Sequence, residues 1–167
     1  MSGSLNFIFH LFGFGILVTT LLAGWILERQ QRKEIILDQK LYILSLSKKI
    51  GLLSPLAVLI MLVTGIINIH TVFGSNFRVL FEVGWLAAKI VLFAFLLVNG
   101  AVLGPMLSRK RQKYLESVRT QPFTDEIAVT LKSLNRNIST FYLVQWLLVI
   151  LITFLSVFGT GKHAGVV

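Results

Sequence analysis

Two histidines lie inside hydrophobic segments of the chain, and they are the first candidates for chemistry. His10 falls near the start of one apolar segment, and His70 falls near the end of another. An imidazole inside a membrane is unfavourable without a partner, so such residues commonly mark a functional site. Two imidazoles on facing helices are suitable axial ligands for the iron of a b-type haem. We therefore predict one bound haem b with His10 and His70 as its metal ligands.

A lysine, Lys89, lies within a further apolar segment. A lysine at that depth costs about 2.5 to 3.5 kcal/mol on insertion scales unless it is paired or reaches water. Glu82, seven residues earlier on the same helical stripe, is one candidate counter-charge, but Arg78 competes for it at the favourable spacing of four. A haem propionate is the alternative partner, and direct ligation or proton delivery by Lys89 also remains open.

Three other residues are candidates for cofactor contact beside Lys89. Gly13 shares a helical face with His10, and small residues on such a face let backbones approach or a flat macrocycle fit. Trp85 shares the stripe of Lys89, and Arg78 lies near its outer end. The alternative for each histidine is an ordinary interfacial side chain that bonds to a carbonyl or a headgroup. The third histidine, His163, lies in a glycine-containing tail and is expected to be solvated.

The elements that must position these residues are membrane helices. Hydrophobic residues make up 55% of the 167 residues and charged residues 14%, which excludes a soluble domain. Four apolar segments, at 7–27, 52–73, 80–106 and 141–158, approach or exceed the roughly 20 residues that span a bilayer. Strand-like alternation is absent from them. We predict an all-α, four-helix integral membrane bundle, formed as a single transmembrane domain over residues 1–167.

The distribution of basic residues predicts how this bundle is oriented. The connections at 28–51 and 107–140 carry thirteen of the sixteen lysines and arginines. The positive-inside rule places both connections in the cytoplasm, and both termini on the outer side. Helix rise then places His10 and His70 at matching depths, about 5 Å below the outer surface. A bacterial inner membrane is the simplest location, and the first segment is expected to be retained rather than cleaved as a signal peptide.

The net charge of +9 does not by itself indicate nucleic acid, because the basic connections lack interleaved base-stacking aromatic residues. Contact with lipid headgroups accounts for them, and phosphate binding is the alternative. The connection at 28–51 is expected to extend the membrane helices or to form a short interfacial helix. Thr124, followed by two acids, predicts the start of a helix that continues into the fourth span. The absence of cysteine excludes c-type haem attachment, iron–sulfur clusters and disulfides.

Several of these segments together resemble a known family. They are helix one with His10, the segment from Ser47 to Pro55 that leads to Thr64 and Gly65, and Gly84-Trp85-Leu86-Ala87-Ala88-Lys89 followed by an aliphatic run to Asn99. This pattern is similar to the four-helix HemJ and CopD-like membrane proteins. The resemblance implies a haem- or porphyrin-associated protein in which His10 and Lys89 match the intramembrane histidine and lysine. The methionine- and histidine-rich motifs expected of a copper carrier are missing.

The sequence thus favours a b-type haem protein that transfers electrons to a redox partner or within a larger membrane complex. A HemJ-like protoporphyrinogen oxidase, in which Lys89 and His10 bind or deprotonate the substrate, is the first alternative. A cofactor-free accessory subunit of a respiratory or photosynthetic complex is the second.

Overall fold

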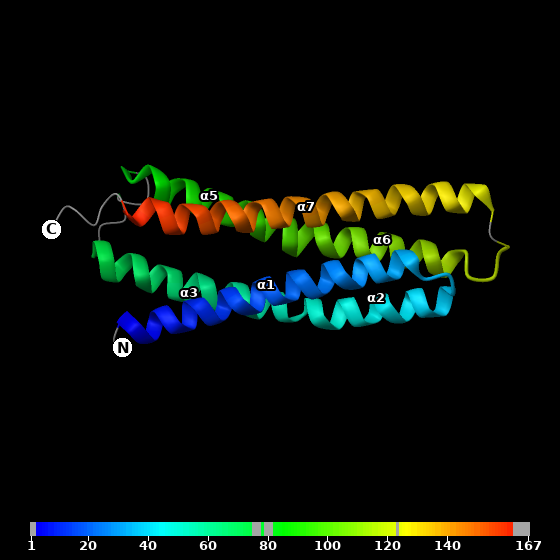
Figure 1. Cartoon of the computed structure of the whole chain (residues 1–167), viewed down its shortest axis with the longest axis horizontal. Coiled ribbons are helices and arrows are strands. Elements are labelled where there is room, and N and C mark those ends of the chain that lie inside the picture. Colours follow the sequence, from blue (N-terminus) through cyan, green and yellow to red (C-terminus); the bar gives the residue numbers. More distant parts are fainter. Residues whose placement is uncertain (1–2, 75–77, 79–81, 123, 162–167) are drawn as a thin grey trace.

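The computed structural model describes residues 3–74, 78, 82–122 and 124–161, and every regular element within them is a helix. Four helical stretches are long and apolar enough to cross a membrane, and they lie side by side along the long axis of the molecule (Figure 1). These stretches are Ser4–Lys33, Leu37–Phe73, Gly84–Ser117 and Asp125–Gly159. The predicted all-α class and the four membrane-compatible helices are confirmed. The predicted start of the third span at residue 80, like His163, lies outside the described residues.

The first and last helices are longer than a bilayer requires. Helix α1 (Gly3–Lys33) has 31 residues and α7 (Asp125–Gly161) has 37. At 1.5 Å per residue they measure about 46 and 55 Å, against a hydrocarbon thickness of about 30 Å. The Thr124 hydroxyl accepts a long hydrogen bond from the Ile127 N–H at the start of α7, as an N-cap does. The predicted helix that runs from this point into the fourth span is confirmed.

Helix α2 (Leu37–Gly51) continues into α3 (Leu53–Phe73), with a break at Leu52. There the Leu52 N–H donates to the Lys49 carbonyl, three residues back, at 3.3 Å, and this bond closes a tighter turn than that of an α-helix. Pro55 is accommodated in the first turn of α3, where a backbone N–H has no helical partner. Gly74 ends α3 with a φ of 66°, a conformation that favours glycine. The connection at 28–51 is therefore mostly a continuation of the first two membrane helices.

The third membrane stretch changes its hydrogen-bond pattern halfway. It consists of α5 (Gly84–Val98), a π-helical turn η1 (Asn99–Leu103) and α6 (Gly104–Ser117). Pro105, in the first turn of α6, lacks an N–H and would clash with the carbonyl four residues before it. The Gly104 N–H bonds to the Asn99 carbonyl, five residues back. The wider turn relieves the conflict that the proline creates.

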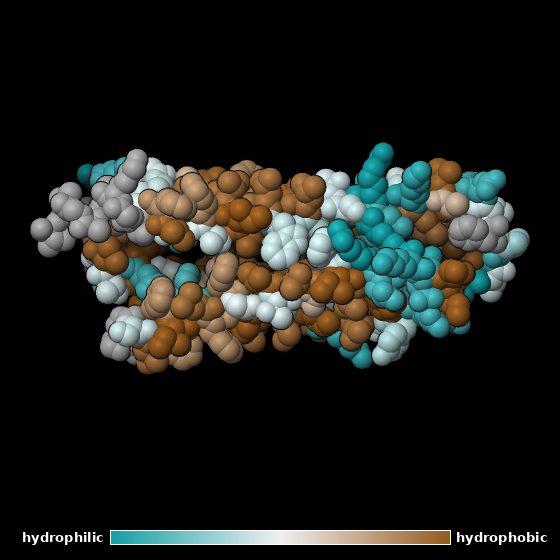
Figure 2. All heavy atoms as spheres, viewed as in Figure 1, coloured by the Kyte–Doolittle hydropathy of each residue, from teal (hydrophilic) through white to brown (hydrophobic). Residues whose placement is uncertain are grey.

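The helices are arranged as two antiparallel pairs. Helix α1 packs on α2 and α3, while α5, η1 and α6 pack on α7. The pairs meet through a core of apolar side chains, consisting of Leu17, Ala57, Met61, Leu96, Leu148, Val149 and Ile152. In Figure 1 the pairs diverge towards the end at which α1 begins and α7 ends. Figure 2 shows hydrophobic side chains over that part of the molecule and hydrophilic ones around α2 and α6.

Candidate cofactor site

A ladder of polar side chains joins α1 to α3 at the end where the helix pairs diverge. Asn6 and His10 are four residues apart on α1, and Thr64 and Asn68 are four residues apart on α3. The Asn6 amide donates to the Asn68 side-chain oxygen at 2.5 Å and to the Thr64 carbonyl at 3.0 Å. His10 Nδ1 lies 2.8 Å from the Thr64 hydroxyl oxygen. The sequence analysis identified only His10, although the matching spacings of four were a signal for the other three.

The bonds of Thr64 determine the tautomer of His10. The Thr64 hydroxyl donates to the Ile60 carbonyl at 2.6 Å, so its hydrogen is not available to His10. We therefore assign the Nδ1–H of His10 as the donor to the Thr64 oxygen. In this tautomer Nε2 carries the lone pair, as it does in metal-ligating histidines whose other nitrogen donates to a protein oxygen.

His70 lies away from this ladder. Its side chain is exposed, whereas that of His10 is half-buried between α1 and α3, close to Gly65. From Thr64 to His70 is six residues, which corresponds to about 9 Å along α3 and a rotation of about 120° from the face that meets α1. His70 therefore lies on a different side of α3 from the Thr64 hydroxyl that meets His10, and the pairing of the two imidazoles on one iron stays a prediction.

Lys89 faces the ladder from the other helix pair. It is half-buried on α5, and its ammonium lies within electrostatic range of the His10 imidazole. No carboxylate in the described part of the chain pairs with it. Glu82, the counter-charge considered from the sequence, is exposed and makes no such pair. Lys89 is thus a cation within an apolar span whose charge no described acid balances.

The other candidate contact residues have different surroundings. Trp85 packs against α7, where a Cβ added to Gly159 would lie 2.8 Å from its ring. Gly13 packs against α3, where an added Cβ would lie 2.9 Å from Ile60 and 3.2 Å from the Ala57 carbonyl. Close helix packing thus accounts for both positions. Arg78 is exposed in the described part of the α3–α5 connection.

The chemistry of the donor set fits a haem with one protein ligand. His10 offers an imidazole whose second nitrogen is already bonded, and Lys89 offers a cation for a propionate. The surface is hollowed between the two helix pairs at this end of the molecule (Figure 2). Among the described residues there is no cluster of three or more histidine, cysteine or acidic side chains that could hold a bare metal ion.

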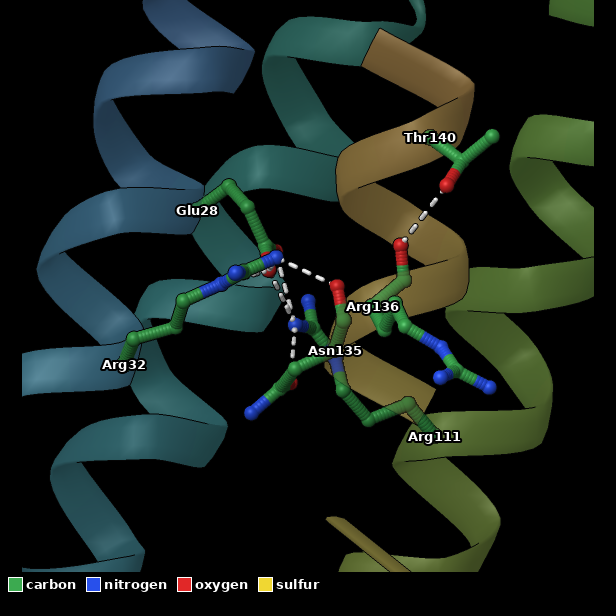
Figure 3. A network of polar contacts seen from close by, with 6 residues as sticks. All are labelled: Glu28, Arg32, Arg111, Asn135, Arg136 and Thr140. Atoms are coloured by element: carbon green, nitrogen blue, oxygen red, sulfur yellow. Dashed lines mark hydrogen bonds and ion pairs between the residues drawn. The ribbon is translucent and has the colours of Figure 1, made fainter. Parts of the chain in front are cut away.

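A second polar cluster, which sequence analysis missed, lies at the opposite end of the bundle (Figure 3). Glu28 on α1 and Arg111 on α6 form an ion pair at 2.7 Å, with side chains only 4% and 5% exposed. Arg32 also bonds to Glu28, at 2.8 Å, and Arg111 donates to the Asn135 side chain on α7. The signal was a single acid, Glu28, at the end of an apolar segment and next to basic residues.

Two buried amides lie between these clusters. The Asn99 side-chain nitrogen, on η1, and the Gln145 side-chain oxygen, on α7, have no hydrogen-bond partner among the described residues. Gly100 allows the Gln145 amide to approach the π-helical turn, since an added Cβ would lie 2.8 Å from its nitrogen. The interior of the bundle therefore carries polar groups at its middle as well as at both ends.

Comparisons of this chain with protein-family models, with curated proteins and with solved structures found no match.

Proposed function

We propose that this chain is a membrane protein that binds one b-type haem in the outer half of the bilayer and serves in electron transfer. The observation that carries the proposal is the His10–Thr64 hydrogen bond, which leaves Nε2 of an intramembrane histidine with a lone pair. The unbalanced charge of Lys89 on the facing helix supports it, because haem propionates are anions. Haem would supply one-electron redox chemistry that the side chains alone cannot provide.

Each residue has a defined part in this proposal. His10 would hold the iron through Nε2, and Thr64 fixes the ring orientation by accepting from Nδ1–H. Asn6 and Asn68 hold α1 and α3 in register beside that ring. Lys89 would pair with a propionate or act as a second ligand to the iron, since it is half-buried and lies within electrostatic range of His10.

Porphyrinogen oxidation is the second candidate, and the position of His70 favours it. Without a second imidazole opposite His10, one face of the site is open to a substrate. His10 and Lys89 would then bind or deprotonate the substrate, as the resemblance to HemJ-like proteins implies. If the purified protein contains no haem, the third candidate, a cofactor-free accessory subunit, is favoured.

The charge distribution supports a cytoplasmic position for α2 and α6, with both termini outside. Thirteen of sixteen basic residues lie in the two connections at that end. We propose a multi-pass protein of a bacterial inner membrane, with lipid and a redox partner or a larger complex as its partners.

The test is the optical spectrum and haem content of the purified full-length protein and three variants. We expect His10→Ala to lose haem and His70→Ala to retain it, because His10 is half-buried and bonded to Thr64 whereas His70 is exposed. Lys89→Arg keeps the charge but removes an amine that can ligate iron. An unchanged spin state in Lys89→Arg therefore indicates propionate pairing, and an altered one indicates ligation.

Other spectra would overturn the proposal. Loss of a six-coordinate Soret band in both histidine variants would restore the bis-histidine site predicted from the sequence. A wild-type protein without haem would favour the accessory subunit, and porphyrin accumulation in a deletion strain would favour the oxidase.

A further inference from the structure

We propose that the cytoplasmic end of the bundle holds a binding site for a phosphate-bearing anion. A groove of about 740 Å³ lies between α1, α2, α6 and α7. None of the described residues that line it is acidic, and five are cationic. These five residues, which we call the basic groove, are Arg32, Lys40, Arg111, Lys132 and Arg136.

The charges in the basic groove are not balanced by protein carboxylates. Arg32 and Arg111 share a single acid, Glu28, so these three residues together keep one positive charge. No carboxylate in the described part of the chain pairs with Lys40, Lys132 or Arg136. The positive-inside rule explains why this end is basic. It does not explain why cations from four helices line one groove.

Arg111 provides an independent indication of a ligand. Its side chain is 5% exposed, and its guanidinium is held by Glu28 and Asn135 (Figure 3). Its Nε is buried and has no hydrogen-bond partner among the described residues. A buried donor without a partner is costly, and a fixed guanidinium is suited to phosphate oxygens. Arg111 therefore lines the groove as a cation that Glu28 and Asn135 hold in place, and its polar groups are not all paired within the described protein.

The position of the groove allows two sources of phosphate. Its α7 residues, at 128–139, directly precede the apolar segment 141–158, so the groove lies just outside the hydrocarbon. An anionic lipid headgroup can reach it from the membrane, and a soluble phosphate compound can reach it from the cytoplasm. Both present the same oxygen acceptors to the same cations.

The test compares two double variants of the full chain that remove equal charge. Lys132→Gln with Arg136→Gln changes the groove but leaves the Glu28 ion pairs intact. Lys48→Gln with Lys49→Gln removes two exposed cations that do not line the groove. Binding of inorganic phosphate is measured in detergent at constant ionic strength. Thermal unfolding is then measured in nanodiscs of phosphatidylcholine with and without phosphatidylglycerol.

We expect the groove variant to lose roughly tenfold in affinity for each contact removed, while the control keeps wild-type binding. Phosphate binding in detergent identifies a soluble ligand, and stabilisation by phosphatidylglycerol alone identifies a headgroup. Equal losses in the two variants, or no effect of either probe on the wild type, would overturn the proposal. Thermal unfolding of each variant without phosphate shows whether that variant is folded. If the double variant Lys132→Gln with Arg136→Gln is unfolded, the single variants Arg136→Gln and Arg136→Lys replace it. Arg136→Lys keeps the charge and should still bind phosphate, whereas Arg136→Gln should bind it more weakly.

Discussion

At the scale of single residues, Thr64 decides what His10 can do. Its hydroxyl hydrogen is committed to the Ile60 carbonyl, and its oxygen accepts from the imidazole. The arrangement leaves one nitrogen of His10 for a ligand and fixes the plane of the ring. A polar residue that would otherwise be only a helix-packing contact thus acts as a positioning residue for the proposed iron ligand.

We expect Thr64→Val to weaken haem binding by about tenfold to a hundredfold, because valine keeps the shape but removes the acceptor for Nδ1–H. Haem titration of the purified variant, followed in the Soret region, measures this effect. Thr71→Val is the matched control, since the Thr71 hydroxyl also bonds to a carbonyl of α3 but is exposed. Equal affinities for the two variants would show that Thr64 has no part in the site.

Glu28 of α1 belongs to a polar network that joins α1, α6 and α7. Glu28→Gln would leave the buried Arg111 guanidinium without its carboxylate, and breaking such a pair typically costs about 3 to 5 kcal/mol. We expect a clear fall in Tm in detergent. Asp38→Asn removes an exposed ion pair with Arg119 and should cost less than about 1 kcal/mol. A Glu28 variant as stable as the Asp38 variant would contradict this account of the network.

At the scale of helices, α1 and α3 approach each other closely at Gly13 of α1. Two glycines of α1, Gly13 and Gly15, lie two residues apart, but only Gly13 contacts α3. In a bilayer, where lipid tails are as apolar as side chains, such close approach is a main source of helix association. Gly13 thereby sets the distance between the helices that carry His10 and Thr64.

Gly13→Ala should destabilise the protein by about 1 to 3 kcal/mol, since the new methyl group would lie too near Ile60 and the Ala57 carbonyl. Gly15→Ala meets nothing within 4 Å and should leave the stability unchanged or slightly raised. Thermal unfolding of the two variants in the same detergent checks the difference. Equal Tm values would mean that α1 and α3 do not pack closely at Gly13.

At the scale of the whole molecule, the two helix pairs converge at the basic end and diverge at the other (Figure 1). Long helices carry polar clusters well apart from one another, with Glu28 and Arg111 at one end and His10 and Lys89 towards the other. The proposed haem site and the proposed anion site therefore lie at opposite ends of the bundle and do not compete for the same residues.

The proposed orientation is testable because the chain has no cysteine. Single substitutions at two exposed serines, Ser4→Cys and Ser117→Cys, place one thiol at each end of the bundle. A membrane-impermeant maleimide should label the first in intact cells and the second only after the membrane is opened. The opposite pattern would reverse the orientation and with it the predicted side of the haem site.

The sequence by itself determined the membrane helices, because in hydrocarbon each apolar segment must form its backbone hydrogen bonds internally. It also singled out His10 and Lys89, since ionisable groups in apolar spans are few and conspicuous. Only the tertiary structure decided that His10 meets Thr64, that His70 is exposed, and that Glu28 pairs with Arg111, 83 residues away. The sequence of a helix that is apolar on nearly every side does not show which side faces a neighbouring helix. That side is decided by packing contacts such as that of Gly13.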